Sequence, residues 1–264
     1  MNLMVEPFFG EFGWQLMRWQ GYVRSEAKKY KKVVVCCETG YEYLYQDITS
    51  EIWHYDKPKG MVRDMCRGLF KDREVSLCDG WGISDPKPTI HNSNILCPGK
   101  WLSNPYCELT QEFIRFGRSV QRLNIVLFHA RNAQYSYRNW PLSKWIELNN
   151  KINVETASVG TRTESLYIPG TTDLRGIPLN QLADLMRKSA VLVTPSSGIA
   201  HFASLCELPH VVWSDSRRWA MGLTNEYRYK VAWNPFHTHC TFITHEQWQP
   251  DVESVYQAIC QYLS

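Results

Sequence analysis

The sequence predicts an α/β protein with two lobes, each built on a parallel sheet. Strand-like and helix-like segments alternate in both halves of the chain, and this order favours parallel strands joined by helices. The chain has 264 residues, 44% of them hydrophobic, which is enough for two lobes of common domain size. We place the lobes at residues 1–118 and 119–264.

The first lobe begins with a strand, a glycine turn and a helix. Residues 3–5 form a short apolar run, the turn GEFG occupies 10–13, and apolar side chains then recur at helical spacing as far as Lys29. The following KKVVVCCE is typical of a buried strand, so the two strands are expected to pair in parallel. Residues 39–100 show no clear pattern, and we expect a linking helix at 111–121.

The second lobe has a clearer pattern. Strands are expected at NIVLFHA, NVETASVG, VLVT and HVVW, and helices at PLSKWIELNNKI, PLNQLADLMRKSA and SSGIAHFASLCEL. Pro141 and Pro178 stand where two of these helices begin, a position that proline favours. The final DVESVYQAICQYL is typical of an amphipathic helix. This alternation predicts a doubly wound, Rossmann-like sheet, in which ligands bind beyond the carboxyl ends of the strands.

Composition and the absence of common motifs limit the classes of protein to which the chain can belong. The net charge of +3 is mildly basic, and no apolar run approaches the roughly 20 residues that span a bilayer. The first residues lack the pattern of a signal peptide. Nine scattered cysteines without a CxxC pair favour reduced thiols over a zinc site, so we expect a cytoplasmic protein, in the host cytoplasm if it is viral. The motifs GxxxxGK[ST], GxSxG, HExxH and GxGxxG are absent, as is any Asp-x-Asp pair.

The segment TPSSGIAH, which follows the expected strand VLVT, is the first candidate binding loop. Ser196 and Ser197 stand where a helix begins, and their hydroxyls suit the free N–H groups there. Gly198 lets a ligand come close, and the positive end of a helix suits a diphosphate. His201 shares a face with Ser197, opposite the apolar stripe, so we expect it to face the ligand. An ordinary capped helix with an incidental histidine is the alternative.

Two more loops of this lobe carry candidate donor-binding residues. Arg131 and Arg138, with Lys144 slightly later, follow NIVLFHA and would neutralise a diphosphate, although solvated loop arginines explain the same pattern. A third loop follows NVETASVG, where such sheets commonly hold a base or ribose. Its candidates are Gly160, Thr161 and Glu164.

The glycine turn of the first lobe carries the candidate catalytic residue. Glu11 stands at a strand-to-helix turn, where a carboxylate can act as a general base. The alternative is that Glu11 only stabilises the helix amino end. Its neighbours Gly10, Gly13 and Trp14 are candidates for contact with an acceptor.

The ordered series from 124 to 213 resembles the C-terminal lobe of the heptosyltransferase-like glycosyltransferases, family 9, which have the GT-B fold. RNWPLSKWIEL, a strand ending in SVG, and LRGIPLNQLADLMRKSAVLVTPSSGIAH carry the resemblance. It implies two Rossmann-like lobes with a nucleotide-sugar cleft between them. It also implies that Ser197, Gly198 and His201 contact a diphosphate, and that Arg131 and Arg138 contact phosphate or sugar.

The chain departs from this family at two positions. Ser196 stands where the family has an acidic residue before S/T-G. Trp14 stands where the family turn G-x-x-G-D has its catalytic aspartate, so Glu11 becomes the substitute candidate for the base.

The resemblance implies a glycosyltransferase that moves a hexosyl, heptosyl or pentosyl group with inversion. The donor would be a nucleotide-diphosphate sugar acting as co-substrate, with no cofactor, and the acceptor a saccharide or glycolipid. The absence of an Asp-x-Asp pair favours an enzyme that needs no metal and stabilises the leaving phosphate with protein groups.

Three other functions stay open at the level of sequence. The Arg-, Lys- and Trp-rich stretch from Trp53 to Trp81 suits a DNA acceptor with a hydroxymethylated base, although ordinary surface charge explains the same residues and is favoured. A non-catalytic module that binds nucleotide sugars or nucleic acid is a second alternative, because Trp14 replaces the usual acid. A sugar-nucleotide epimerase of similar fold is a third.

Overall fold

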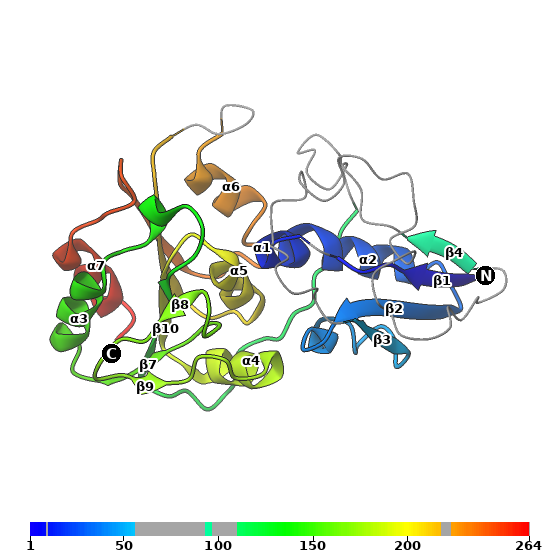
Figure 1. The fold of residues 1–264 in the computed structure, drawn as a ribbon, viewed down its shortest axis with the longest axis horizontal. Coiled ribbons are helices and arrows are strands. Elements are labelled where there is room, and N and C mark those ends of the chain that lie inside the picture. Colours follow the sequence, from blue (N-terminus) through cyan, green and yellow to red (C-terminus); the bar gives the residue numbers. More distant parts are fainter. Residues whose placement is uncertain (9, 56–92, 97–109, 218–222, 264) are drawn as a thin grey trace. The chain divides into compact units, whose positions relative to one another are not determined.

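The chain forms two compact units, Met1–Ile114 and Arg115–Ser264, which we call unit 1 and unit 2. The sequence predicts a boundary after Arg118. Each unit carries its own parallel sheet. The computed structural model, shown in Figure 1, describes residues 1–8, 10–55, 93–96, 110–217 and 223–263.

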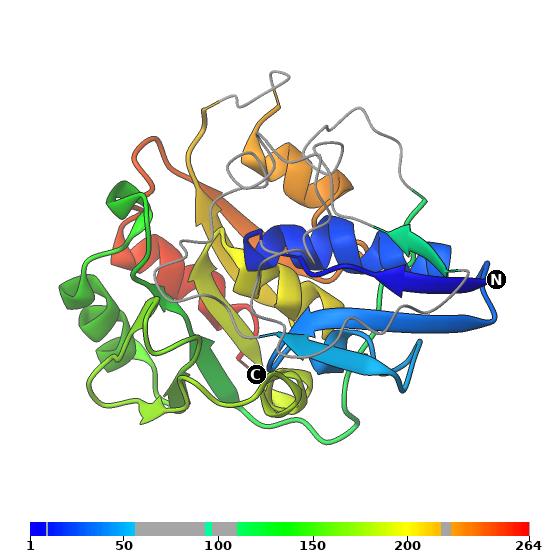
Figure 2. The same ribbon diagram turned by 45° about the vertical axis from the view of Figure 1, so that its right-hand side comes forward.

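The described part of unit 1 contains a parallel sheet in the order β3-β2-β1-β4, whose strands lie side by side in Figure 2. Strand β1 pairs in parallel with β2, which confirms the predicted strand–helix–strand unit. Both β3 and β4 lie in the stretch 39–100, where the sequence shows no clear pattern. The bounds are β1 Asn2–Val5, α1 Phe12–Trp14, a π turn Gln15–Trp19, α2 Gln20–Ala27, β2 Lys32–Glu38, a 3-10 turn Glu42–Leu44, β3 Ile52–Tyr55 and β4 Ser93–Leu96.

The helical segment of unit 1 is anchored by apolar packing and by an ion pair between a buried arginine and an exposed aspartate. Leu16 and Val23 are fully buried on its inner face. Arg24 is also buried, and its Nε and Nη2 atoms donate to the two carboxylate oxygens of Asp47 at 3.0 and 2.6 Å. This bidentate pairing offsets the cost of removing the guanidinium from water. It therefore ties α2 to the segment that follows β2.

In unit 2 the described residues form one large parallel sheet, a short antiparallel pair and helices on both faces. The strands are β5 Ile125–Phe128, β6 Ala130–Arg131, β7 Glu155–Ser158, β8 Ser165–Leu166, β9 Thr172–Asp173, β10 Val191–Pro195, β11 His210–Ser214 and β12 Cys240–Thr244. The helices are α3 Leu142–Lys151, α4 Leu179–Lys188, α5 Gly198–Leu205, α6 Asn225–Val231 and α7 Val252–Cys260, with a 3-10 turn at Ser136–Arg138.

The large sheet of unit 2 has the Rossmann strand order. Its strands lie in the order β12-β11-β10-β5-β7-β9, and each neighbouring pair is parallel. Numbered along the chain, this order is 3-2-1-4-5-6 read from β9, as in dinucleotide-binding sheets. The predicted α/β class with Rossmann-like sheets is confirmed. The chain reverses direction across the sheet between β5 and β10, so this is the switch point where ligands bind.

Alternate residues of the central strands face opposite layers of helices, as the two-residue period of a strand requires. Phe128 of β5 packs in one core cluster with Trp145 of α3 and Val255 of α7. Val212 of β11 packs in another cluster with Ala200 of α5. Figure 1 shows α3 and α7 together on one side of the sheet and α5 on the other. The helices predicted at α3, α4, α5 and α7 are all confirmed.

The linking helix expected at 111–121 is wrong, because this segment forms no helix. Its N–H groups donate to distant carbonyls instead of to the fourth preceding residue: Phe116 bonds Leu205 at 2.9 Å and Ser119 bonds Arg187 at 3.1 Å. Gly117 has a φ of +70°, which a right-handed helix does not allow. The segment is therefore held by tertiary hydrogen bonds.

Candidate functional site

The switch point of unit 2 brings together the two loops that the sequence favours. Phe128 at the end of β5 lies beside Val193 of β10, so His129 and Thr194 follow at the same edge of the sheet. Nδ1 of His129 lies 3.0 Å from Oγ1 of Thr194, which in turn lies 3.3 Å from Oγ of Ser197. A polar chain of three side chains therefore runs from the end of β5 to the start of α5.

His129 is neutral in this chain. Burial lowers its pKa to about 3, and the nearby positive charge of Arg131 acts in the same direction. A neutral imidazole donates from one ring nitrogen and accepts at the other, so it orders the Thr194 hydroxyl without adding charge. Neither His129 nor Thr194 was a candidate from the sequence, although both stand at predicted strand ends.

The start of α5 is shaped differently from the expected capped helix. Ser197 occupies the cap position with an extended backbone, but its side chain makes no hydrogen bond to the helix N–H groups. Its hydroxyl turns instead toward Thr194. The Ser196 N–H donates to the Trp213 carbonyl at 2.8 Å, which fixes the turn to β11. Because the Ser197 side chain does not cap the helix, the amino end of α5 is suited to an anionic ligand.

Arg138 lies beside the start of α5. Its Nη2 atom donates to the backbone carbonyl of Ser196, and its guanidinium lies 4.5 Å from the ring centre of Trp248. Trp248 is buried and follows β12, far along the chain. Arg138 therefore places a positive charge beside the amino end of α5, where it adds to the helix dipole. Trp248 has no sequence signal of its own, because its role depends on a tertiary contact.

Arg131 has a different environment from Arg138. Its side chain is buried and donates into its own loop, to the carbonyl of Ala133 at 3.4 Å, to the carbonyls of Gln134 and Tyr135, and to the side chain of Asn139. Arg131 thus closes the 132–139 loop around its guanidinium.

Lys144 also donates to backbone carbonyls of its own unit. Its Nζ donates to the carbonyls of Pro250 at 3.0 Å and Gln249 at 3.4 Å and lies 5.4 Å from the ring centre of Trp140. The Trp140 indole donates to the same Pro250 carbonyl at 3.1 Å. Lys144 therefore fastens the segment after β12 to the first turn of α3.

The loop after β7 is a compact turn that adjoins His129. Gly160 has a φ of +113°, and a Cβ atom there would lie 2.6 Å from Cδ2 of His129. The Thr161 hydroxyl accepts from the Glu164 N–H at 3.1 Å, and the Glu164 carbonyl accepts from the Asn132 N–H at 2.8 Å. The turn is thus joined to the loop after β5, and the side chain of Glu164 is exposed.

The expectation that His201 faces a ligand is wrong. Its side chain is buried, stacked on Tyr229 at 5.6 Å between ring centres and edge-on to Trp233 at 5.2 Å. Helix α6 and the residues after it cover the face of α5 that the sequence pattern left open. Burial lowers the pKa of His201 to about 3, and a backbone hydrogen bond to Trp233 opposes this shift. Within the described residues its Nδ1 has no hydrogen-bond partner.

In unit 1 the candidate residues lie after the carboxyl end of β1. The backbone carbonyl of Glu11 accepts from the N–H groups of Trp14 and Gln15 at 3.0 and 3.1 Å, and its side chain does not cap α1. Gly10 is buried, whereas Gly13 and Trp14 are partly exposed. Glu6, a second carboxyl that the sequence did not single out, is buried directly after β1.

The stretch from Trp53 to Trp81, on which the DNA alternative rests, lies outside the described residues beyond Tyr55. In the part of the chain that is described, no group of His, Cys, Asp and Glu side chains is arranged to hold a metal ion. None of the described helices is long and apolar enough to span a bilayer.

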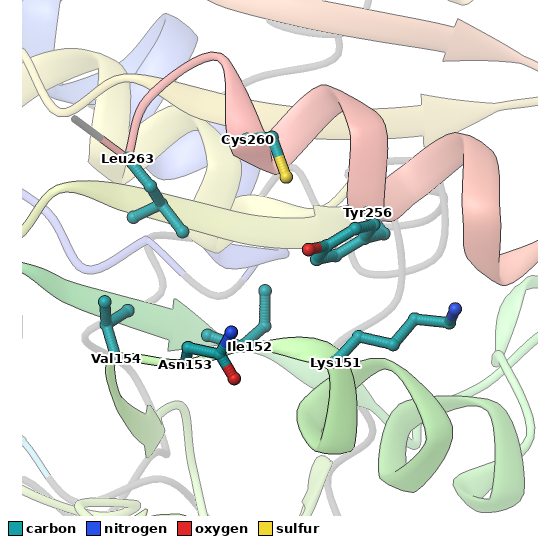
Figure 3. A pocket seen from close by; sticks show the side chains of 7 residues that line it. All are labelled: Lys151, Ile152, Asn153, Val154, Tyr256, Cys260 and Leu263. Atoms are coloured by element: carbon teal, nitrogen blue, oxygen red, sulfur yellow. The ribbon is translucent and has the colours of Figure 1, made fainter.

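A hollow of about 200 Å³ opens elsewhere in unit 2 (Figure 3). Residues 151–154 join α3 to β7, so this hollow lies at the amino end of β7. The candidate loops all follow carboxyl ends, at the opposite edge of the sheet. It is lined by Lys151, Ile152, Asn153, Val154, Tyr256, Cys260 and Leu263, none of which is a candidate residue.

No protein-family model and no curated protein matches the chain. Solved structures match it over almost its whole length. A family 9 glycosyl transferase from Veillonella parvula is 12% identical, with a TM-score of 0.57, and the match covers 99% of this chain and 97% of that one. The chain has the fold of glycosyltransferase family 9.

Two Escherichia coli structures give the same result. ADP-heptose lps heptosyltransferase II is 15% identical, with a TM-score of 0.56, over 100% of this chain and 98% of that one. Heptosyltransferase WaaC with ADP is 10% identical, with a TM-score of 0.52, over 99% and 97%. At these identities the likeness establishes the fold alone.

Proposed function

We propose that this chain is a glycosyltransferase that moves a sugar from a nucleoside-diphosphate donor to an acceptor hydroxyl. The observation that carries the proposal is the meeting of Arg138 with the start of α5 at the switch point of a Rossmann-ordered sheet. This is where such sheets bind nucleotides. The shared fold with family 9 supports the same activity.

The donor diphosphate would lie at the amino end of α5. Ser197 and Gly198 begin this helix, the side chain of Ser197 does not cap it, and Arg138 lies beside it. Together they offer hydrogen-bond donors and positive charge to a leaving diphosphate, with no metal ion required of the site. The fold relative WaaC holds ADP, which supports a nucleoside diphosphate as the leaving group.

The reaction would be a single displacement with inversion. The acceptor oxygen forms a bond to the anomeric carbon while the bond from that carbon to the phosphate oxygen breaks, and the electron pair leaves on the diphosphate. A general base takes the proton from the acceptor hydroxyl. We assign this role to Glu11, the carboxylate of the glycine turn that follows the carboxyl end of β1. A saccharide or glycolipid is the proposed acceptor.

Nucleotide binding tests the proposal directly. ADP, UDP, GDP and CDP are titrated in EDTA by calorimetry, with melting temperature as a second readout, because a bound ligand stabilises the native state. Arg138→Ala should lower the affinity for the nucleotide that binds by about 10- to 100-fold, which corresponds to the loss of a charged hydrogen bond. Arg122→Ala, an exposed arginine before β5, is the matched control and should change nothing. Absence of binding by all four nucleotides would overturn the proposal.

Glu11 is tested separately from donor binding. Glu11→Gln keeps the size of the side chain and removes its basicity, so transfer should fall by about 100-fold or more while nucleotide affinity stays the same. Full transfer activity in this variant would remove Glu11 from the mechanism and leave the donor site standing.

A further inference from the structure

Two exposed tyrosines stand on the loop that carries Arg138. Tyr135 and Tyr137 are 45% and 44% exposed, and their ring centres lie 6.2 Å apart at an angle of 59°. Large exposed rings that lie together commonly mark a binding surface. Their position beside the proposed diphosphate site connects them with the donor.

The loop holds these rings in a fixed place. Arg131 donates to several carbonyls of the loop and to Asn139, which fastens its backbone from the inside. Tyr135 has a left-handed backbone with a φ of +62°, which is unfavourable for a residue with a side chain. A strained backbone that persists in a fastened loop is characteristic of binding sites.

Tyr137 lies on the β11 and β12 side of the switch point. The guanidinium of Arg217, which follows β11, lies 5.3 Å from its ring centre. The ring of Trp248, which follows β12, lies 6.4 Å away, edge to face. The Gln249 side chain donates to the Tyr137 carbonyl at 3.4 Å. These contacts orient the ring and leave nearly half of the residue exposed.

The strand order separates the two ends of a bound donor. The proposed diphosphate lies at the end of β10, the turn at Gly160 follows β7 on one side, and Tyr137 lies toward β11 and β12 on the other. A nucleotide sugar has its nucleoside at one end of the diphosphate and its sugar at the other. The loop after β7 is the candidate site for the base or ribose. With the nucleoside on that side, the sugar extends toward Tyr137.

We infer that Tyr135 and Tyr137 form the binding surface for the transferred sugar, with the ring of Tyr137 packed against the C–H face of a pyranose. An aromatic face is apolar and electron-rich, so it packs well against the polarised C–H groups of a sugar. Because the loop is already fixed, the rings lose little conformational freedom on binding. This inference rests on the proposed function and assigns the sugar part of the donor to named residues.

The test compares each nucleoside diphosphate with its sugar conjugate. Dissociation constants are measured for ADP and ADP-glucose, UDP and UDP-glucose, and GDP and GDP-mannose. The dissociation constant of the nucleoside diphosphate divided by that of its sugar conjugate gives the contribution of the sugar to binding. Tyr137→Ala should lower this ratio by about five-fold, the worth of one stacking contact, and leave the affinity for the nucleoside diphosphate unchanged.

Three further variants make the result specific. Tyr137→Phe keeps the ring and should keep the ratio. Tyr135→Gly removes the other ring at a position whose backbone suits glycine, and should lower the ratio while the protein stays folded. Tyr167→Ala is the matched control, because Tyr167 is 40% exposed with the guanidinium of Arg175 5.6 Å from its ring, and it should not change the ratio.

The outcomes separate this inference from the proposed function. An unchanged ratio in Tyr137→Ala, or an equal loss of both affinities, overturns the sugar surface while nucleotide binding stands. Failure of all three pairs to bind the wild-type chain overturns the proposed function and the sugar surface together.

Discussion

The guanidinium of Arg138 lies 4.5 Å from the ring centre of Trp248, although the two residues come from opposite ends of unit 2. Trp248 is buried, so its indole offers a fixed surface against which the guanidinium rests. A cation over an indole face is stabilised by the ring quadrupole, most of all where water is excluded. Trp248 thus positions the charge that Arg138 brings to Ser196.

Replacing Trp248 should weaken nucleotide binding even though the residue is not assigned to the ligand. The affinity of Trp248→Leu for the nucleoside diphosphate should be about 3- to 30-fold lower than that of wild type, because Arg138 loses its cation–π contact. Trp248→Phe keeps an aromatic face and should lose less. Calorimetry measures the affinity, and urea unfolding records the separate cost to stability. Equal affinity in wild type and Trp248→Leu would show that Arg138 does not depend on the ring.

Gly160→Ala should destabilise unit 2. The φ of +113° is reserved for glycine, and an added Cβ would lie 2.6 Å from Cδ2 of His129 and 2.7 Å from Oγ of Ser165. We expect a loss of at least about 2 kcal/mol in the free energy of unfolding, from backbone strain and from displacement of buried His129. Urea denaturation measures it. Gly176→Ala is the control, because that φ is also positive but its nearest neighbour is the flexible Arg162 side chain at 3.3 Å. Equal losses in the two variants would remove the contact with His129 from the explanation.

The sequence predicts the elements of unit 2 whose periodicity is strong. Helices α3, α4 and α7 are marked by amphipathic spacing, and the buried strands β5, β10 and β11 by apolar runs. The alternation of these elements is sufficient for the fold class. The expected helix at 111–121 fails because Gly117 and the tertiary hydrogen bonds of Phe116 and Ser119 outweigh the local pattern.

The candidate site is predictable where loops follow strands and unpredictable where distant segments meet. The TPSSGIAH loop and Arg138 are found from position alone, and the structure brings them together. The same reasoning gives Arg131 the role of Arg138, since no local pattern shows that its guanidinium turns into its own loop. It also leaves His201 exposed, because the covering residues Tyr229 and Trp233 come from α6 and the turn after it.

Acid should destabilise unit 2 through its buried histidines. Burial lowers the pKa of His129 and His201 to about 3 and that of His210 to about 4, from an ordinary 6.5. Below pH 6.5 the unfolded chain binds protons that the folded chain does not, so stability falls as the pH drops from about 6.5 toward about 4. Each histidine contributes up to about 1.4 kcal/mol per pH unit in this window.

Urea unfolding between pH 7.5 and 4.5 measures this dependence. His129→Gln should reduce the slope by about a third if the three histidines contribute equally. Asp173, whose pKa the adjacent Arg175 lowers, contributes only at more acidic pH, below about 4, and does not interfere. A stability that stays constant from pH 6.5 to 4.5 would contradict the burial of these side chains as neutral groups.

Replacing Arg131 should lower stability, whereas replacing Arg138 should weaken nucleotide binding. In Arg131→Lys a single ammonium replaces a planar group that donates to the carbonyls of Ala133, Gln134 and Tyr135, and a lysine cannot reach them together. We expect a loss of about 2–3 kcal/mol in the free energy of unfolding and faster hydrogen exchange of the loop amides. Arg138→Lys should keep stability and exchange close to wild type and weaken nucleotide binding instead. Arg122→Lys serves as the exposed control. If Arg131→Lys and Arg138→Lys altered stability and nucleotide affinity alike, the division of the two arginines into a loop anchor and a ligand contact would fail.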